Sequence, residues 1–393
     1  MIVRKINKGI LLEELRSIGV DKRADDIFKD KSELILLKLY NINSKGANIL
    51  KQEFIGANGD VAIHRDVASW KKPTTDCLLI GTMRTYKTVL NKLRFEPFFG
   101  LSEVAETIKK ALSNSNLPSY KIRDRVFDFE KEKYVMGILN VTPDSFSDGG
   151  MFNNVEKALK HTEEMIGQGA DFIDIGGEST RPGAEKVSEE EEKQRVIPVI
   201  KEIRNNFPNI PISIDTYKAN VAKEAIKSGA DIINDISGLQ FDKQMKDVAK
   251  AFDVPVIVTH IKGTPKDMQK NPYYADVMKE LLEYFEERIN LLTDFGIEKI
   301  IIDPGIGFGK RVEDNLKIIR NIREFTIFHL PILLGASRKS FIGNILNETV
   351  EKRLSGTMAV DAYALMNGVN IIRVHDVKSH KDLIKMLQAI KNA

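Results

Sequence analysis

The feature that most constrains the fold is a repeated unit, a short apolar run followed by a stretch of helical periodicity, which extends from residue 134 to residue 391. The apolar runs lack polar alternation, which is typical of parallel strands covered on both faces. Eight such units over about 260 residues fit a closed barrel better than an open sheet. The predicted strands are 134–139, 172–175, 210–214, 231–233, 254–258, 299–302, 331–334 and 370–374.

The helical stretches complete these units, and strands that alternate with helices imply right-handed βαβ crossovers. In one of them Val221 and Ala225 form an apolar stripe opposite Lys223 and Glu224. The fold class is therefore predicted to be α/β, a (β/α)8 TIM barrel with a small N-terminal α/β domain. Helices are expected at 155–167, 188–205, 218–227, 242–251, 275–295, 314–322, in a long stretch that ends at Met366, and at 381–391.

The chain is predicted to divide near residue 113. Residues 1–112 form the small domain, a polar linker covers 113–125, and the barrel domain covers 126–393, with a short hairpin at 126–133 closing its amino end. Because the small domain shows no catalytic constellation, an oligomerisation or docking role is favoured over a second enzyme. His64, Trp70 and Cys77 are interpreted as structural. Its expected elements are helices at 11–17, 86–93 and 102–112, strands at 34–40 and 77–80, and a turn at 56–59.

The charge balance is nearly even, with 59 Lys and Arg against 56 Asp and Glu. A formal net charge of +3 gives no case for nucleic acid or a membrane surface as partner, so an anionic ligand must be held locally. A single cysteine excludes an intrachain disulfide and a cysteine-based zinc site. The amino end lacks a signal-peptide pattern, and no apolar run reaches the ~18–20 residues of a membrane span. We therefore expect a cytoplasmic protein.

Polar side chains follow every predicted strand of the barrel. The chemistry of such barrels lies at the carboxyl ends of the strands, so these side chains are expected to converge on one mouth. Asp215 alone could be a helix N-cap, but polar groups at all eight ends are hard to explain structurally. The strand ends carry Asn140, the loop that starts at Gly176, Asp215, Asn234 with Asp235, His260, Asp303, the run Ser337–Arg338–Lys339, and Arg373 with His375.

These residue types predict a ligand with two different ends. Arg373 and His375 are two residues apart on one strand end, and an arginine fork suits phosphate oxygens. Asp215, Asn234 and Asp303 offer acceptors to a ring rich in N–H donors, such as an aminopyrimidinone. The site is therefore predicted to be bipolar, with acceptors at its deep end and cations at the other. The long Gly- and Ser-rich loops after the first two strands, which contain Phe146 and Pro182, are candidate lids.

Three weaker patterns are read as structural. Gly305–Gly309 lacks the acidic residue and the first-strand position of a dinucleotide-binding loop. The acidic run Glu189–Glu192 is interpreted as the solvated first turn of a helix. Metal binding by His260 with His375 stays a minor alternative, because nothing else provides zinc-like spacing.

Seven motifs stand in this order along the barrel domain: MGILNVTPDSFSDGG (136–150), GGESTRPGA (176–184), SIDT (213–216), IND (233–235), DPGIGFGK (303–310), GASRKSF (335–341) and RVHDV (373–377). They resemble the motifs of dihydropteroate synthase. The resemblance covers roughly residues 122–393 and implies condensation of 6-hydroxymethyl-7,8-dihydropterin pyrophosphate with p-aminobenzoate, with release of pyrophosphate, by a homodimer that uses Mg²⁺. The first 112 residues lie outside the resemblance.

The resemblance also implies roles for single residues. The catalytic group would be Asn140, Asp215, Lys339, Arg373 and His375. The pterin would be held by Asp215, Asn234, Asp303 and Lys339. The pyrophosphate would be held by Asn140, Arg373 and His375, with Asn140 also a ligand of Mg²⁺. The p-aminobenzoate site and its loops would be formed by Phe146, Thr180, Arg181, Pro182, Phe308 and Ser337, beside Lys339.

Pyrophosphate departure before attack by the arylamine is the expected order, because Mg²⁺, Arg373 and His375 can stabilise the leaving charge. One departure from the family pattern is Lys262, which adds a charge after the fifth strand and leaves an anionic relative of p-aminobenzoate open as substrate. Two alternatives remain: a pterin-dependent methyltransferase on the same barrel, and a non-catalytic pterin-binding paralogue. The complete set of loop motifs favours the synthase over both.

Overall fold

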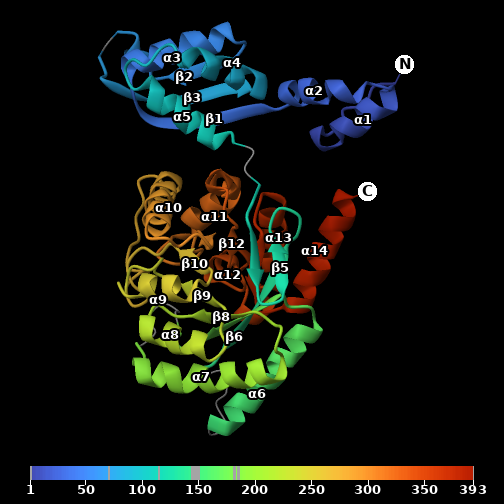
Figure 1. Cartoon of the computed structure of the whole chain (residues 1–393), viewed down its shortest axis with the longest axis vertical. Coiled ribbons are helices and arrows are strands. Elements are labelled where there is room, and N and C mark those ends of the chain that lie inside the picture. Colours follow the sequence, from blue (N-terminus) through green and yellow to red (C-terminus); the bar gives the residue numbers. More distant parts are fainter. Residues whose placement is uncertain are drawn as a thin grey trace. The chain divides into compact units, whose positions relative to one another are not determined.

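The computed structural model describes residues 2–69, 71–113, 116–142, 151–179, 183 and 186–392. The chain forms two compact units, Met1–Asn114 and Ser115–Ala393, each with its own hydrophobic core (Figure 1). No helix among the described residues is long and apolar enough to cross a membrane.

The second unit contains the predicted barrel, and each strand lies within two residues of its predicted bounds. All neighbouring strands pair in parallel, in the order β11-β10-β9-β8-β7-β6-β13-β12, and a parallel bridge from Ile302 to Ile332 links the two ends of the sheet. The TIM-barrel prediction is confirmed. The strands are β6 (Tyr134–Asn140), β7 (Phe172–Gly176), β8 (Ile212–Asp215), β9 (Ile232–Asp235), β10 (Val256–Thr259), β11 (Ile300–Asp303), β12 (Leu333–Leu334) and β13 (Ile371–Val374).

The helices of this unit surround the strands (Figure 1). The long helical stretch predicted to end at Met366 is in fact two helices, because Asn347 adopts a left-handed conformation (φ 53°) that ends the first of them. The α-helices are α6 (Met151–Gly167), α7 (Glu189–Asn206), α8 (Ala219–Lys227), α9 (Met245–Phe252), α10 (Val277–Asp294), α11 (Val312–Arg320), α12 (Ser340–Leu346), α13 (Leu354–Met366) and α14 (Val377–Lys391).

A hairpin closes the amino end of the barrel, but with a different partner strand from the predicted one. The strand β5 (Arg125–Asp128) pairs with β4 (Ser119–Ile122), which lies inside the segment predicted to be a linker. Alternating aromatic and aliphatic side chains of the hairpin pack on the lower barrel interior, and the Tyr120 hydroxyl donates to the Ile300 carbonyl at 2.8 Å. The sequence signal for β4 was the alternation of the buried residues Tyr120 and Ile122 with polar residues, but the polar residues around them favoured a linker.

The first unit is a three-stranded antiparallel sheet with order β1-β3-β2 and packed helices. Cys77 is buried in its core, as predicted. Prediction missed α2, α3 and β2, because α3 contains two glycines, which lower helix propensity, and β2 is very short. The elements are α1 (Leu11–Ile18), α2 (Asp25–Ser32), β1 (Leu34–Asn43), α3 (Ser44–Gly56), β2 (Asp60–Ile63), β3 (Thr74–Thr82), α4 (Met83–Leu93) and α5 (Leu101–Ala111).

Candidate active site at the carboxyl ends of the barrel strands

An arginine and two carboxylates occupy the centre of the barrel mouth. The Arg373 guanidinium donates to Asp215 Oδ2 from Nη2 at 2.8 Å and to Asp174 Oδ2 from Nε at 2.5 Å. The Asn234 amide donates to the same Asp174 oxygen at 3.1 Å. Strands β7, β8, β9 and β13 thus meet through one hydrogen-bonded cluster, which includes three of the predicted site residues.

Asp174 is a member of this cluster that sequence reasoning missed. Its side chain is fully buried, and its Oδ1 atom has no hydrogen-bond partner within the described residues. The missed signal was an aspartate inside the apolar run 172–175, two residues before the strand end, where its side chain points into the barrel. A carboxylate in such a run needs a partner, and Arg373 provides it.

The guanidinium of Arg373, which the sequence places at the cationic end, is hydrogen-bonded to two carboxylates of the acceptor end in this structure. Its long side chain reaches across the barrel to the acceptors, because a buried charge is costly unless it is paired. Burial raises the pKa of Asp215 to about 7, although the Arg373 charge opposes the shift. In this structure the positive charge of Arg373 is therefore already neutralised by carboxylates.

A second cluster joins the ends of β11 and β12. The Lys339 ammonium donates to the Ile306 carbonyl and lies 4.3 Å from the centre of the Phe308 ring, a cation–π distance. Burial lowers the pKa of Lys339 to about 8, partly offset by the charge of Asp303. Asp303 itself accepts from the Gly305 amide at 2.8 Å, and burial raises its pKa. Lys339, Phe308 and Asp303 are thus brought together as predicted.

His375 and Ser337 are also neighbours, with Nδ1 and Oγ 2.9 Å apart. Arg338, between Ser337 and Lys339, does not join the mouth as expected. It adopts a left-handed conformation (φ 56°), and its guanidinium forms two hydrogen bonds to Asp376. The Arg338 side chain is therefore held by Asp376, whereas Ser337 and Lys339 contact His375 and Ile306.

Two other basic residues have structural partners. The Lys310 ammonium lies 2.9 Å from His260 Nδ1 in a buried network, and burial holds the pKa of His260 well below its usual value. Lys262 donates to Glu280 at 2.9 Å and to the Tyr273 carbonyl. The Lys262 charge is therefore balanced by a carboxylate, and it gives no support to an anionic relative of p-aminobenzoate.

Four predicted loop residues lie outside the described residues: Phe146, Thr180, Arg181 and Pro182. The remaining predicted residue, Asn140, is the last residue of β6, beside Gly176 at the end of β7. The missing side chain of Gly176 leaves room there, since a Cβ at this position would lie 3.9 Å from Asn140 Oδ1 and 3.8 Å from Asp215 Oδ2.

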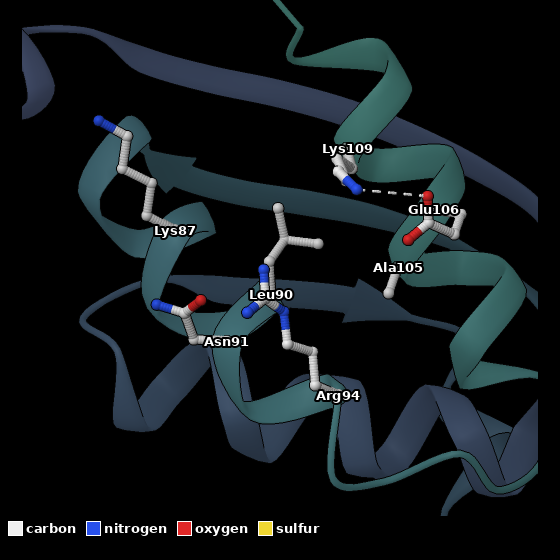
Figure 2. A pocket seen from close by; sticks show the side chains of 7 residues that line it. All are labelled: Lys87, Leu90, Asn91, Arg94, Ala105, Glu106 and Lys109. Atoms are coloured by element: carbon white, nitrogen blue, oxygen red, sulfur yellow. Dashed lines mark ion pairs between the residues drawn. The ribbon is translucent and has the colours of Figure 1, made fainter.

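The first unit has a cleft of about 310 Å³ between α4 and α5 (Figure 2). Lys87, Arg94 and Lys109 contribute three cationic groups to its lining, and Glu106 contributes one carboxylate. Lys87 is paired with Asp30 at 2.6 Å, and Lys109 lies 3.7 Å from Glu106. The lining therefore carries a net positive charge over an apolar floor of Leu90 and Ala105.

Comparisons with known proteins agree with this site. The model of the family described as pterin binding enzyme matches residues 136–375. A dihydropteroate synthase of Clostridium beijerinckii is 49% identical over 273 residues, which are 69% of this chain and 98% of the relative. The crystal structure of Yersinia pestis dihydropteroate synthase with a sulfonamide drug superposes with a TM-score of 0.66 at 43% identity, covering 70% of this chain and 100% of that one.

A third relative extends over both units. It is the bifunctional dihydropteroate synthase/dihydropteroate reductase of Helicobacter pylori, 34% identical over 395 residues, covering 100% of this chain and 99% of the relative. The barrel, its polar mouth and these similarities lead to one assignment. The chain belongs to the pterin-binding enzyme family, as a dihydropteroate synthase that condenses a dihydropterin pyrophosphate with p-aminobenzoate in folate biosynthesis.

Proposed function

We propose that Asp215, Asn234 and Asp303 accept the N–H donors of the pterin ring, while Arg373 and His375 hold the pyrophosphate. The observation that carries this division is the cluster in which Asp174 bonds to both Asn234 and Arg373. A pterin that takes Asp215 displaces one hydrogen bond of Arg373, but Asp174 retains the guanidinium. Arg373 then stays at the mouth with its Nη groups directed to the leaving group, where charge develops.

Lys339 and Phe308 are proposed to line the boundary between the two substrates. The ammonium over the Phe308 ring lies next to Asp303, so it can donate to the pterin from one side and face the p-aminobenzoate from the other. Ser337, hydrogen-bonded to His375, is proposed to border the same pocket. The arylamine is a weak base, and we propose that it attacks the pterin methylene after pyrophosphate has begun to leave.

The donor set at the mouth fits Mg²⁺. This ion favours oxygen ligands and usually combines one or two protein groups with phosphate oxygens and water. Asn140 Oδ1 and Asp215 Oδ2 both face the space left by the absent side chain of Gly176. We propose Asn140 as the protein ligand. When bound, the ion would neutralise charge on the departing pyrophosphate.

The pH profile tests the roles of Asp215 and Lys339. Asp215 accepts hydrogen bonds fully only as a carboxylate, so kcat/KM for the pterin pyrophosphate falls below a pH of about 7. Lys339 loses its charge above a pH of about 8, so kcat/KM falls again on that side. We expect a bell-shaped profile, measured as pyrophosphate release at saturating Mg²⁺ and p-aminobenzoate.

The Lys339→Arg variant separates the two limbs. Arginine stays charged far above pH 8, so the alkaline limb disappears while the acid limb remains. A flat profile in the unmodified protein, or an alkaline limb that persists in Lys339→Arg, contradicts these roles. To test whether the metal is required, the same assay is run with a chelator and then with excess Mg²⁺. Loss of pyrophosphate release with the chelator and its recovery with Mg²⁺ would show the requirement.

We propose a second, reductive activity that depends on the first unit. The supporting observation is that similarity to the bifunctional relative extends over the whole chain, whereas similarity to the Clostridium beijerinckii synthase covers 69% of it. Reduction of the C6=N5 bond of dihydropteroate requires a hydride at C6 and a proton at N5. A reduced nicotinamide nucleotide can supply the hydride, and its phosphates suit the cationic cleft between α4 and α5.

This proposal predicts oxidation of a reduced nicotinamide nucleotide by the full chain, dependent on added 7,8-dihydropteroate and matched by tetrahydropteroate. Arg94→Gln is expected to raise the KM for the nucleotide about 10-fold, the usual effect of losing one charged hydrogen bond. Arg84→Gln is the matched control, because Arg84 lies on α4, the helix that ends just before Arg94, but outside the cleft lining. Absence of nucleotide oxidation in the full chain contradicts the second activity, and synthase turnover provides the check of folding.

A homodimer and a cytoplasmic location complete the proposal. Exposed apolar side chains gather on the last helices of the barrel unit, where a second copy can cover them. They are Ile345 and Leu346 on α12, Tyr363 and Met366 on α13, and Met386 and Ile390 on α14. The single, buried thiol of Cys77 fits a reducing compartment.

A further inference from the structure

The loop after β11, residues 305–309, is held by a side-chain donor at each of its five carbonyl oxygens. Backbone carbonyls need partners, and in an irregular surface loop water commonly provides them. Five side-chain donors in succession therefore indicate a loop whose position is set by its surroundings. The donors are, along the loop, Lys310 to Gly305, Lys339 to Ile306, Gln269 to Gly307, Lys310 to Phe308 and Tyr274 to Gly309.

Lys310 is the residue that serves two of these carbonyls. It is 2% exposed, and its Nζ lies 2.9 Å from the Gly305 oxygen, 3.1 Å from the Phe308 oxygen and 2.9 Å from His260 Nδ1. Burial holds the pKa of Lys310 well below its usual value, although the charge of Asp303 opposes the shift. An uncharged amine keeps two N–H donors, and its lone pair can accept from the His260 ring. Both carbonyls can therefore be held in either protonation state.

The loop also lies directly against the backbone that follows β10. A Cβ at Gly305 would be 2.0 Å from the His260 carbonyl oxygen, and a Cβ at Gly309 would be 2.2 Å from that of Lys262. Both glycines have left-handed conformations, with φ of 67° and 64°, which side chains disfavour. Steric contact thus fixes the two ends of the loop, and side-chain hydrogen bonds determine where the residues between them lie.

The same loop supports Lys339, which is the N-cap residue of α12 and belongs to another part of the chain. Lys339 donates to the Ile306 carbonyl, and its ammonium lies 4.3 Å from the centre of the Phe308 ring. Its Cδ would be 3.1 Å from a Cβ at Gly307, so its aliphatic part follows the loop closely. Lys310 holds the residues on either side of this contact, because Gly305 precedes Ile306 and Phe308 follows Gly307.

We infer that Lys310 is a positioning residue for Lys339: by holding the carbonyls of Gly305 and Phe308, its Nζ fixes the Ile306 carbonyl and the Phe308 ring, which keep the Lys339 ammonium at the barrel mouth. Lys310 is buried between His260 and the loop carbonyls, so its effect on the mouth passes through the loop. The contacts described above place Lys339, and only the consequence for turnover rests on the proposed function of Lys339.

Chemical labelling of lysine amines tests this placement without any substrate. The full-length unmodified protein and its Lys310→Met variant are pulse-labelled with acetic anhydride over a range of pH, and mass spectrometry gives the labelling rate of each lysine. The limiting rate of Lys339 at high pH, where its amine is uncharged, is expected to rise about 10-fold in Lys310→Met, the usual effect of losing a charged hydrogen bond. An unchanged limiting rate overturns the inference.

The limiting rate decides the result because the pKa of Lys339 responds to charge as well as to position. Burial is the main cause of its low pKa, and the charged groups that face it are Asp303, Arg373 and Asp215. Lys310 is a further positive group nearby. Loss of burial and loss of the Lys310 charge both raise the pKa of Lys339, whereas loss of the charge alone leaves the limiting rate unchanged.

Two controls accompany the labelling. Lys317→Met removes an exposed lysine of α11 that pairs with Asp276 at 3.2 Å, and we expect it to leave the labelling of Lys339 unchanged. Lys218, 12% exposed and ion-paired, is an internal control in every sample, because general unfolding would speed its labelling too. If Lys218 is labelled faster in Lys310→Met, Lys310→Gln, which keeps a shorter donor, takes the place of that variant.

Turnover tests whether Lys310 acts through Lys339. In Lys310→Met we expect kcat/KM for the pterin pyrophosphate to fall about 10-fold and the alkaline limb of its pH profile to move to higher pH. Adding Lys310→Met to Lys339→Met is expected to cause no further loss, since two residues that act as a unit are not additive. A full further loss in the double variant contradicts an action through Lys339.

The two measurements separate this inference from the proposed function. If Lys310→Met releases Lys339 to labelling but Lys339→Met keeps full turnover, the inference stands and the proposed role of Lys339 fails. If Lys339→Met lowers turnover and Lys310→Met leaves the limiting rate of Lys339 unchanged, Lys339 has its proposed role but Lys310 does not position it.

Discussion

Replacing Asp174 with asparagine is expected to lower kcat/KM for the pterin pyrophosphate by about 100-fold, because removing one partner of a buried charge pair costs about 2–5 kcal/mol. The carboxylate accepts from Arg373 and from Asn234 with one oxygen. Asparagine keeps the size of the side chain but lacks the negative charge. Arg373 then depends on Asp215 alone, and the pterin competes for that group.

The measurement is steady-state pyrophosphate release with each substrate varied in turn. The predicted loss resides in the pterin pyrophosphate dependence, since no hydrogen bond joins Asp174 to the Lys339 and Phe308 cluster in the described part of the site. Asp171→Asn is the matched control. Asp171 is also buried and ion-paired, to Arg125 and Lys381. It lies just before the amino end of β7, at the opposite end of the barrel from the candidate site.

If Asp171→Asn reduces kcat/KM as much as Asp174→Asn does, the effect reflects stability of β7 and not the position of Arg373. If Asp174→Asn retains activity within 3-fold, Asp215 is a sufficient partner and the cluster has no role in pterin binding. Thermal unfolding of both variants distinguishes these explanations. A variant in which β7 is destabilised unfolds at a lower temperature than the unmodified protein, whereas displacement of Arg373 alone leaves the melting temperature unchanged.

The barrel could be predicted from the sequence because its determinants are local. Parallel strands covered on both faces require continuous apolar runs, and 254–258 and 300–302 show them without reference to any partner. The hairpin at the amino end differs in this respect. Its strand β4 is recognised by the residues it packs on, such as Ile300, which lies far along the chain. Local polarity therefore pointed to a linker.

The candidate site was predictable for residues at strand ends and not for residues within strands or helices. Asp215, Asn234 and Asp303 stand where the barrel geometry places chemistry. Asp174 and Glu192 do not: one is inside an apolar run, and the other belongs to an acidic run whose members are mostly solvated. Glu192, predicted to be solvated, is instead buried against Lys218, and Asp174 is buried against Arg373. Three-dimensional packing brings these partners together, so the local sequence does not reveal them.

For Arg338 the prediction erred in the opposite direction, because it placed at the site a residue that does not join it. Its position between Ser337 and Lys339 suggested a group at the mouth, but a left-handed backbone conformation directs it to Asp376. Such a conformation is uncommon for a residue with a Cβ atom and has no signature in the sequence. Residue type and strand position predicted which region holds the site, whereas the backbone decides which side chains enter it.

Outside the site, the Asp361→Ala variant is expected to lose about 3–5 kcal/mol of unfolding free energy, the usual cost of leaving one member of a buried ion pair alone. Asp361 on α13 and His380 on α14 are both fully buried, with Oδ2 and Nε2 3.1 Å apart. Burial acts to lower the pKa of His380, but the hydrogen bonds and negative charges of Asp361 and Asp376 together outweigh burial and raise the pKa of the imidazole.

Chemical denaturation of the full chain, followed by a probe of the barrel, measures this loss. Asp382→Ala is the matched control, because Asp382 on α14 forms an exposed ion pair with Lys378, and such pairs contribute about 0–1 kcal/mol. The double variant Asp361→Leu with His380→Phe removes both polar groups and fills the space. We expect it to be more stable than Asp361→Ala, because the cost lies in the uncompensated imidazole and not in the absence of an ion pair. If the double variant is as unstable as Asp361→Ala, the loss of unfolding free energy comes instead from packing between α13 and α14.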